Sequence, residues 1–262
     1  MNKKLKNEVW EKEKYLALAE RGSLDTEHPG MKLLLEVASK KRNILDLGCG
    51  EGTRLGMIDG ERKNLTGIDV SETAIKKAKV KYPKIDFFSG NIEKLPFKNG
   101  VFDLIYSVFV FEHLDKPEAV IKEAVKVLKI GGNLFIIAPN FGAPNRASPS
   151  FKGSRFEKLV IGFLNDLFRP FIGSNSLKWN KVKPIANAKA YEMDWDTTIE
   201  PYLGSLIPFV KNRGLTVVNT MACWEEEEKG ANLMQKIFRF LGEKNIYPLK
   251  NWGPHLVLLA QK

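Results

Sequence analysis

The sequence predicts an α/β fold in which a mostly parallel β-sheet is covered by helices on both faces. Between residues 43 and 138, short apolar segments alternate with helical patterns about every 20 residues, which is the rhythm of βαβ units. Segment 134–138, LFIIA, is a continuous apolar run, as a parallel strand buried on both faces requires. These two observations place a parallel sheet in the first half of the chain.

Two helices are expected before the sheet. Residues 7–21 bring apolar side chains to one face of a helix, residues 23–30 are typical of a turn, and residues 31–39 predict a short second helix. In the alternating region, apolar runs predict strands at 43–47, 64–69, 85–89, 101–107 and 133–138.

Helix boundaries in the alternating region follow from capping residues. A short helix is expected after residue 52, and Ser71 is expected to cap the lysine-rich helix 71–80. Pro117 is expected to begin a helix that ends at Lys129, ahead of the pair Gly131-Gly132.

After residue 140 the alternation stops and prolines become frequent. An amphipathic helical segment is expected at 156–171. The remaining predicted elements are a helix at 201–212, a strand at 214–221, a helix at 231–241 and a final strand at 255–260.

The composition limits the class of protein. A chain of 262 residues with 44% hydrophobic residues suits one well-packed domain and excludes a disordered or fibrous chain. No apolar run has the length of a membrane span, and the charged, amphipathic first 20 residues do not resemble a signal peptide. Cys49 and Cys223 indicate neither a disulfide framework nor a metal site, so we expect a cytoplasmic protein without a metal.

The formal net charge is +10, with a local excess of basic residues between Lys152 and Lys189. Two interpretations stay open. The basic stretch contacts an anionic partner, such as a nucleotide-linked substrate, RNA or an anionic membrane, or it is a solvated face. Segment 156–171, flanked by Arg155 and Arg169, permits peripheral contact with a membrane surface.

A loop after the first strand carries the strongest chemical signal. In the segment 46–52, DLGCGEG, the glycines allow a tight turn and close approach of a ligand. Asp69 ends the next strand, about 20 residues later, where a carboxylate suits the two hydroxyls of a ribose. These features place an adenosine-containing ligand at the carboxyl ends of the first two strands. The alternatives are a loop that only connects two elements and an Asp69 that only caps helix 71–80.

The spacing of the glycines distinguishes between cofactors. The loop has the spacing G-x-G-x-G, whereas a dinucleotide fold usually has G-x-G-x-x-G. Asp46 lies beside the loop, where it repels a pyrophosphate but suits an ammonium group. S-adenosylmethionine carries an amino group and a sulfonium, so spacing and charge favour it over NAD, and an oxidoreductase is the weakest alternative.

Five segments in order resemble motifs of class I S-adenosylmethionine-dependent methyltransferases, in the small-molecule branch that includes quinone-biosynthesis enzymes. They are 44–52 (ILDLGCGEG), 67–71 (GIDVS), 90–97 (GNIEKLPF), 102–107 with 111–114 (FDLIYS and FEHL) and 128–135 (LKIGGNLF). The resemblance implies a Rossmann-like, seven-stranded, mostly parallel sheet whose last strand is antiparallel, with a helical insertion or cap. It covers residues 43–138 well and does not specify a substrate.

The resemblance also implies S-adenosylmethionine as cofactor, S-adenosylhomocysteine as product, and a set of cofactor-binding residues. These are Asp46, Gly48, Cys49, Gly50, Asp69, Val70, Asn91, Ile92 and Ser107. Asn91 stands where many relatives carry Asp, and an amide still offers both an acceptor and a donor. The alternative for Asn91 is a turn residue without contact to the cofactor.

The same resemblance divides the chain, which we expect to form one domain over residues 1–262. Residues 1–40 would form a helical cap and 41–139 the cofactor-binding core. Residues 140–200 would form a substrate-side insertion, and 201–262 the rest of the sheet with a second insertion.

Methyl transfer is a displacement in which the protein mainly aligns the reactants, although some acceptors must also lose a proton. His113, just past the fourth strand, is the candidate catalytic general base. Its alternative role is to orient the loop or to contact the cofactor. Tyr191, Asp194 and Asp196 are further acceptor-side candidates, although such residues more often lie on the surface.

The expected acceptor is a small molecule, lipid-like or anionic, methylated on oxygen, with carbon and nitrogen as the alternatives. Aromatic side chains would line its pocket or form the core of a helical cap, namely Phe141, Phe156, Phe163, Phe168, Phe171, Trp179, Tyr191 and Trp195. Two other classes stay open, an RNA methyltransferase and a non-catalytic S-adenosylmethionine-binding protein. Nucleic acid is the weaker partner, because the sequence has no RNA-binding module and no Asn/Asp-Pro-Pro-Tyr/Phe motif after the fourth strand.

Overall fold

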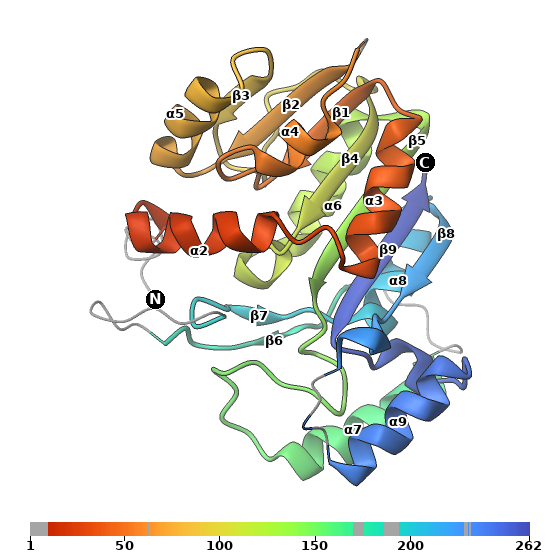
Figure 1. The fold of residues 1–262 in the computed structure, drawn as a ribbon. Coiled ribbons are helices and arrows are strands. Elements are labelled where there is room, and N and C mark those ends of the chain that lie inside the picture. Colours follow the sequence, from red (N-terminus) through yellow and green to blue (C-terminus); the bar gives the residue numbers. More distant parts are fainter. Residues whose placement is uncertain (1–9, 62, 170–175, 186–193, 228–229, 231) are drawn as a thin grey trace.

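The computed structural model describes residues 10–61, 63–169, 176–185, 194–227, 230 and 232–262. Its centre is a seven-stranded sheet with the strand order β3-β2-β1-β4-β5-β9-β8 (Figure 1). The strands are β1 (Asn43–Leu47), β2 (Asn64–Asp69), β3 (Asp86–Ser89), β4 (Phe102–Val108), β5 (Leu128–Pro139), β8 (Thr216–Met221) and β9 (His255–Gln261). β9 runs antiparallel to β5 and β8, whereas β1 to β5 pair in parallel. The predicted fold class, with its antiparallel last strand, is confirmed.

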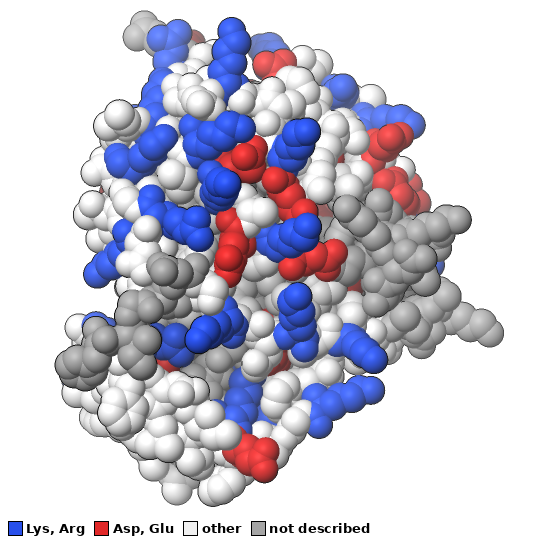
Figure 2. Space-filling view, turned by 180° about the vertical axis from the view of Figure 1, so that it is seen from behind, with Lys and Arg blue, Asp and Glu red and all other residues white. Residues whose placement is uncertain are grey.

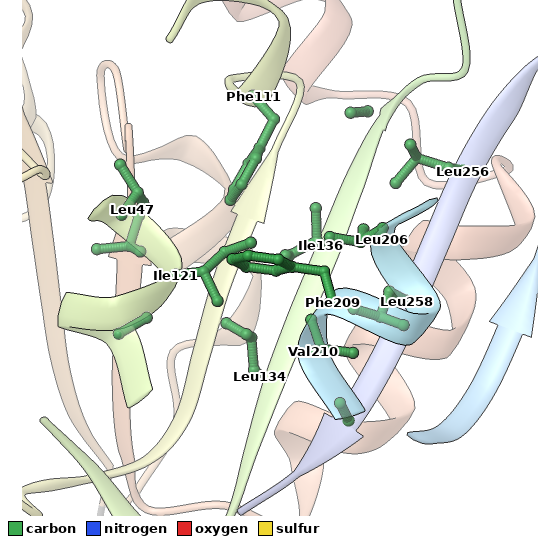
Figure 3. Close-up of a cluster of buried hydrophobic side chains, with 14 of the residues drawn as sticks. Leu47, Phe111, Ile121, Leu134, Ile136, Leu206, Phe209, Val210, Leu256 and Leu258 are labelled. Carbon is green, nitrogen blue, oxygen red and sulfur yellow. The ribbon is translucent and has the colours of Figure 1, made fainter. Parts of the chain in front are cut away.

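Helices cover both faces of this sheet because successive side chains of its strands point to opposite sides. On one face, α3 (Pro29–Ser39), α4 (Thr53–Ile58) and α5 (Glu72–Lys81) contribute side chains to a buried hydrophobic cluster that also contains Phe135 and Ile137 of β5. On the other face, α6 (Pro117–Val127) and α8 (Leu203–Lys211) pack against Leu134 and Ile136. Figure 3 shows this second cluster, in which Phe209 of α8 lies among side chains from α6, β5 and β9.

The helix starts expected from capping residues are confirmed, but one helix end is wrong. Ser71 caps α5, its hydroxyl accepting from the N–H of Ala74 at 3.1 Å. α6 starts at Pro117 but ends at Val127, and β5 begins at the next residue. Leu128 already pairs with Phe102, and the register then shifts, so the glycine pair lies inside the strand rather than after the helix.

The bounds of the two N-terminal helices differ from the predicted bounds by a few residues. α2 (Glu13–Ser23) starts within the predicted helix 7–21 and ends two residues after it, and residues 7–9 lie outside the described chain. α3 starts at Pro29 because His28 caps it, its Nδ1 accepting from the N–H of Gly30 at 3.1 Å.

The second half of the chain adds elements beside the sheet. α7 (Arg155–Phe168) and α9 (Leu233–Glu243) correspond to the predicted helices 156–171 and 231–241, whose residues 170–171 and 231 lie outside the described chain. A short two-stranded sheet, β6 (Asn180–Lys181) with β7 (Ile199–Glu200), was not anticipated. Within the described ranges, no helix combines the length and the apolar character that crossing a bilayer demands.

Candidate active site

The glycine loop, residues 48–52, joins β1 to α4 and depends on glycine for its shape. Gly48, Gly50 and Gly52 have φ angles of +80°, +52° and +80°, in the left-handed region that favours glycine. The N–H of Gly48 donates to the carbonyl of Ile68 at 2.8 Å, which ties the loop to β2. A Cβ at Gly48 would lie 2.5 Å from Val110, whereas a Cβ at Gly50 would meet nothing within 4 Å. Gly50 therefore faces open space at the carboxyl edge of the sheet.

Asp69 lies at the end of β2, directly beside the glycine loop. Its two carboxylate oxygens accept from the N–H of Gly50 at 2.9 Å and from the N–H of Ser71 at 2.8 Å. Burial raises the pKa of Asp69, while these two N–H groups lower it. A carboxylate oxygen has more than one lone pair, so the fixed side chain can accept further hydrogen bonds from a ligand.

Asp46 lies two residues before the loop and is 1% exposed. Neither of its oxygens has a hydrogen-bond partner of ordinary geometry among the described residues. Burial raises the pKa of Asp46 to about 7, the Arg54 guanidinium and the Tyr106 hydroxyl lower it, and the charge of Asp69 raises it. The charge of Arg54 only partly offsets the burial of this carboxylate, so a further cation close to Asp46 would be favourable.

Ser107 is fully buried in β4, and its hydroxyl donates to the carbonyl of Leu47 at 2.9 Å. This bond links β4 to the start of the glycine loop. Ser107 and Asp46 are the two predicted cofactor-binding residues that do not line the cavity described next.

A cavity of about 1070 Å³ opens at this edge of the sheet. The other seven predicted cofactor-binding residues line it, namely Gly48, Cys49, Gly50, Asp69, Val70, Asn91 and Ile92. Asn91 also shapes a turn, because its side-chain oxygen accepts from the N–H of Glu93 at 2.9 Å. The volume lies at the upper end of the range of ligand pockets, so the cavity has room for a cofactor and a second molecule.

His113 lines the same cavity, at the end of the short helix η1 (Phe111–His113). Its Nδ1 lies 3.2 Å from a carboxylate oxygen of Asp196, and its Nε2 lies 3.6 Å from one of Glu112. Asp196 also accepts from the indole N–H of Trp10 at 2.9 Å. The expectation that Asp196 is a surface residue is wrong, since it is 4% exposed, whereas Tyr191 lies outside the described residues.

The charges around His113 are strongly coupled. Burial lowers the pKa of His113, but the carboxylates of Asp196, Glu112 and Asp194 more than offset this, and the net pKa is raised. Burial raises the pKa of Glu112 to about 7, which the positive charge of His113 opposes. The protonation of Glu112 is therefore coupled to that of His113. Among the described residues, no group of His, Cys, Asp and Glu side chains could hold a metal ion.

A pair of histidines, His28 and His255, also lines the cavity and was not anticipated. Nε2 of His28 lies 3.0 Å from Nδ1 of His255, and Nδ1 of His28 accepts from the N–H of Gly30. Because Nδ1 of His28 is an acceptor, its Nε2 carries the hydrogen and donates to His255. Burial lowers the pKa of His255 to about 3, so both rings are neutral at pH 7. The two residues are far apart in sequence, and no local pattern could have paired them.

The half of the cavity away from the glycine loop has mixed character. Phe109 and Phe141 line it together with Asn145, Arg146 and the histidine pair. Of the aromatic residues expected around the acceptor, Phe141 is the one in the described chain that lines the cavity. The others lie elsewhere: Phe156 and Phe168 are exposed, Phe163 packs against Trp252, Trp179 packs against Phe111, Trp195 is half-buried, and Phe171 is outside the described residues.

Comparison with known proteins matches residues 45–136 to a family described as a methyltransferase domain. Ajmaline N-methyltransferase of Rauvolfia serpentina is 33% identical over 221 residues, 80% of this chain and 70% of that protein. An S-adenosylmethionine-dependent methyltransferase of Mycolicibacterium smegmatis is 30% identical over 110 residues, and that match spans 41% of this chain and 43% of the relative. The 2-methyl-6-phytyl-1,4-hydroquinone methyltransferase of Arabidopsis thaliana is 34% identical over 136 residues, 50% of this chain and 35% of that protein.

Solved structures share the fold. An S-adenosylmethionine-dependent methyltransferase from Mesorhizobium loti superimposes with a TM-score of 0.58 at 15% identity, covering 90% of this chain and 99% of that one. A [4+2]-cyclase also superimposes, with a TM-score of 0.52 at 14% identity over 88% of this chain and 80% of that one. The fold alone therefore does not establish methyl transfer.

The family model spans the glycine loop and Asp69, and ajmaline N-methyltransferase is matched over most of both chains. The chain belongs to the class I S-adenosylmethionine-dependent methyltransferases, a family of enzymes whose cofactor is S-adenosylmethionine.

Proposed function

We propose that this protein transfers a methyl group from S-adenosylmethionine to a small-molecule acceptor. One observation carries the proposal: a single cavity joins the glycine loop and Asp69 to a second half large enough for another molecule. When bound, the cofactor supplies an electrophilic methyl group on its own leaving group, so the protein must mainly align the two reactants and exclude water.

The residues of the first half suit the parts of this cofactor. Asp69, held by two backbone N–H groups, would accept hydrogen bonds from the ribose hydroxyls. The open face of Gly50 and the buried charge of Asp46 would accommodate the amino end. Val70 and Ile92 present apolar surface, and Asn91 a polar edge, for the adenine. Cys49 is fully buried against this half, and burial raises the pKa of its thiol well above the usual value, so it packs rather than reacts.

His113 belongs to a proton-accepting group rather than acting alone. Three carboxylates raise the pKa of His113, and burial raises the pKa of Glu112 to about 7, so the protonation of the two neighbouring groups is linked. We propose that an acceptor which must lose a proton delivers it to this cluster of His113, Glu112 and Asp196. Of this cluster, His113 and Glu112 line the same cavity as the glycine loop.

The relatives support a small organic acceptor. One is named for the N-methylation of ajmaline and another for a phytyl-substituted hydroquinone. We propose an acceptor atom that loses a proton on methylation, oxygen first and nitrogen or carbon as alternatives, because the cluster at His113 suits such an acceptor. The two free, buried cysteines support a reducing cytoplasm as the location.

Calorimetry with Asp69→Ala tests the proposed function. We expect wild type to bind S-adenosylmethionine and not NAD, and Asp69→Ala to weaken binding by about 10- to 100-fold, since charge-assisted hydrogen bonds to the ribose are lost. Asp86→Ala, at an exposed position of neighbouring β3, is the matched control and should bind like wild type. A folded wild type that binds no S-adenosylmethionine would contradict the proposal, and NAD binding in its place would favour an oxidoreductase.

An NMR titration of His113 tests the proton-accepting cluster. In Asp196→Asn, we expect the pKa of His113 to fall, because the largest contribution that raises it comes from Asp196. The resonances of His28 and His255 are internal controls and should titrate as in wild type. A His113 pKa that is identical in both proteins would contradict coupling between the ring and Asp196.

A further inference from the structure

Helices α7 and α9 lie at one end of the molecule (Figure 1), and both contact the ring of Trp252. Seven large apolar side chains of α7 and four of α9 are at least 39% exposed. They are Phe156, Val160, Ile161, Phe163, Leu164, Leu167 and Phe168 on α7, and Leu233, Met234, Ile237 and Phe240 on α9. We call these residues the α7–α9 face. Monomeric proteins rarely expose so many apolar side chains together unless the surface binds something.

The inner sides of the two helices are held by polar and aromatic groups. Asp166 of α7 is 1% exposed and accepts from the indole N–H of Trp252 at 2.8 Å. The ring of Trp252 also packs edge-on against the rings of Phe163 and of Phe238 in α9, with ring centroids 6.1 Å and 5.4 Å apart. These contacts fix the orientation of both helices, so their apolar sides face outward in the folded chain. Leu159 of α7 and Phe238 and Leu241 of α9 also pack against the core, so both helices have apolar side chains on the inner and the outer side. An ordinary surface helix has its apolar stripe on the inner side alone.

Basic side chains surround the α7–α9 face. Five exposed cations lie on the two helices or next to them, namely Lys152, Arg155, Lys236, Lys244 and Lys250. The exposed acids counted in the same way are Glu157 and Glu243 on the helices and Glu225 and Glu226 in η3 (Trp224–Glu226) beside α9. Figure 2 shows a broad area without charged side chains at the end of the molecule where Figure 1 places α7 and α9, with Lys and Arg near it. Apolar helices in the surface plane with basic residues around them are the pattern of proteins that bind an anionic bilayer.

The α7–α9 face adjoins the cavity. Arg155, at the start of α7, and Asn232 and Gln235, at the start of α9, line the same cavity as the glycine loop and His113. Gln235 is fixed there by bonds with Asn145, whose amide donates to its side-chain oxygen at 2.9 Å. A surface that meets the α7–α9 face therefore lies next to the half of the cavity assigned to the acceptor.

We propose that the α7–α9 face docks this protein on an anionic membrane surface. The apolar side chains enter the boundary between headgroups and acyl chains, and the surrounding lysines and arginines contact anionic headgroups. Docking brings the acceptor half of the cavity to the bilayer, so the acceptor is an amphiphile dissolved in the membrane. This last step rests on the proposed methyl transfer, whereas docking itself does not.

Cosedimentation with lipid vesicles tests docking. Vesicles of phosphatidylcholine, with and without phosphatidylglycerol, are incubated with wild type, with Phe156→Glu/Phe240→Glu, and with the control Val80→Glu/Ile130→Glu. The control replaces side chains that are 85% and 90% exposed on α5 and β5, away from the two helices. We expect wild type to bind the anionic vesicles, the α7–α9 variant to lose at least fivefold in bound fraction, and the control to change less than twofold. Added salt should weaken wild-type binding.

Three outcomes would overturn the proposal: no binding of wild type to anionic vesicles, equal binding by the α7–α9 variant, or a dimer in analytical ultracentrifugation that this variant abolishes. The third outcome would make the face an interface between two copies. Circular dichroism establishes that each variant is folded. Calorimetry with S-adenosylmethionine on the same samples separates the two proposals. A wild type that binds anionic vesicles but no S-adenosylmethionine contradicts methyl transfer and not docking.

Discussion

Asp46 shows how much a single buried carboxylate can influence this protein. It is placed by β1 beneath the glycine loop, and burial raises its pKa to about 7. An acid with a raised pKa keeps its proton longer in the folded chain than in the unfolded one, so the folded state binds more protons between the two values. The carboxylate therefore destabilises the folded protein increasingly as the pH rises from about 4 to about 7.

Replacing Asp46 should make this effect measurable. We expect the stability of Asp46→Asn relative to wild type to increase with pH between about 4 and 7, by up to about 4 kcal/mol for a shift of this size. Urea unfolding at a series of pH values measures it. Asp86→Asn, at an exposed position of β3, controls for the loss of one negative charge. If the difference in unfolding free energy between Asp46→Asn and wild type is constant over this pH range, folding does not raise the pKa of Asp46.

At the scale of elements, α7 depends on one side chain for its attachment. Asp166 accepts hydrogen bonds from the hydroxyl of Tyr202, from Trp252 and from the Arg169 guanidinium, which joins α7 to the segment before α8 and to the segment before β9. The hydroxyl of Tyr247 donates to the backbone carbonyl of Asp166. A helix whose outward face is apolar is thus anchored by a buried polar centre.

Removing this carboxylate should cost more than ordinary surface changes. We expect Asp166→Ala to lower the unfolding free energy by about 3–5 kcal/mol, because it leaves the buried groups of Tyr202 and Trp252 without their acceptor. Asn165→Ala, at the exposed neighbouring position, should stay within about 0.5 kcal/mol of wild type. Urea unfolding distinguishes the two, and a cost below about 1 kcal/mol for Asp166→Ala would contradict the role of an anchor.

At the scale of the whole molecule, the sheet brings distant segments to one edge. β1 and β4 are neighbours although two strands lie between them in the sequence, so the glycine loop and η1 follow adjacent strands. Ligands in open α/β sheets bind outside the carboxyl ends of such strands. Segments from both halves of the chain, including α2, the region after β5 and the start of β9, complete the cavity.

The local part of this architecture could be predicted from the sequence. The strands β1, β2 and β9 lie where apolar runs predicted them, since a parallel or central strand needs a continuous apolar segment. The glycine loop and Asp69 were also predictable, because G-x-G-x-G after a strand has few other structural uses. The end of α6 was not, because the pairing of Leu128 with Phe102 decided it and is not visible in the local pattern.

The sequence by itself determined the α/β class and the positions of the glycine loop and Asp69 after their strands, because both depend on residues within a few positions of one strand. Tertiary structure decided the rest. His28 and His255, 227 positions apart, form a pair because β9 lies beside β5, and Asp196 joins His113 because the chain after α7 returns to η1. The apolar stripe of α7 was visible in the sequence, but periodicity gives the width of an apolar face and not what covers it. The buried contacts of Asp166 turned that face toward solvent.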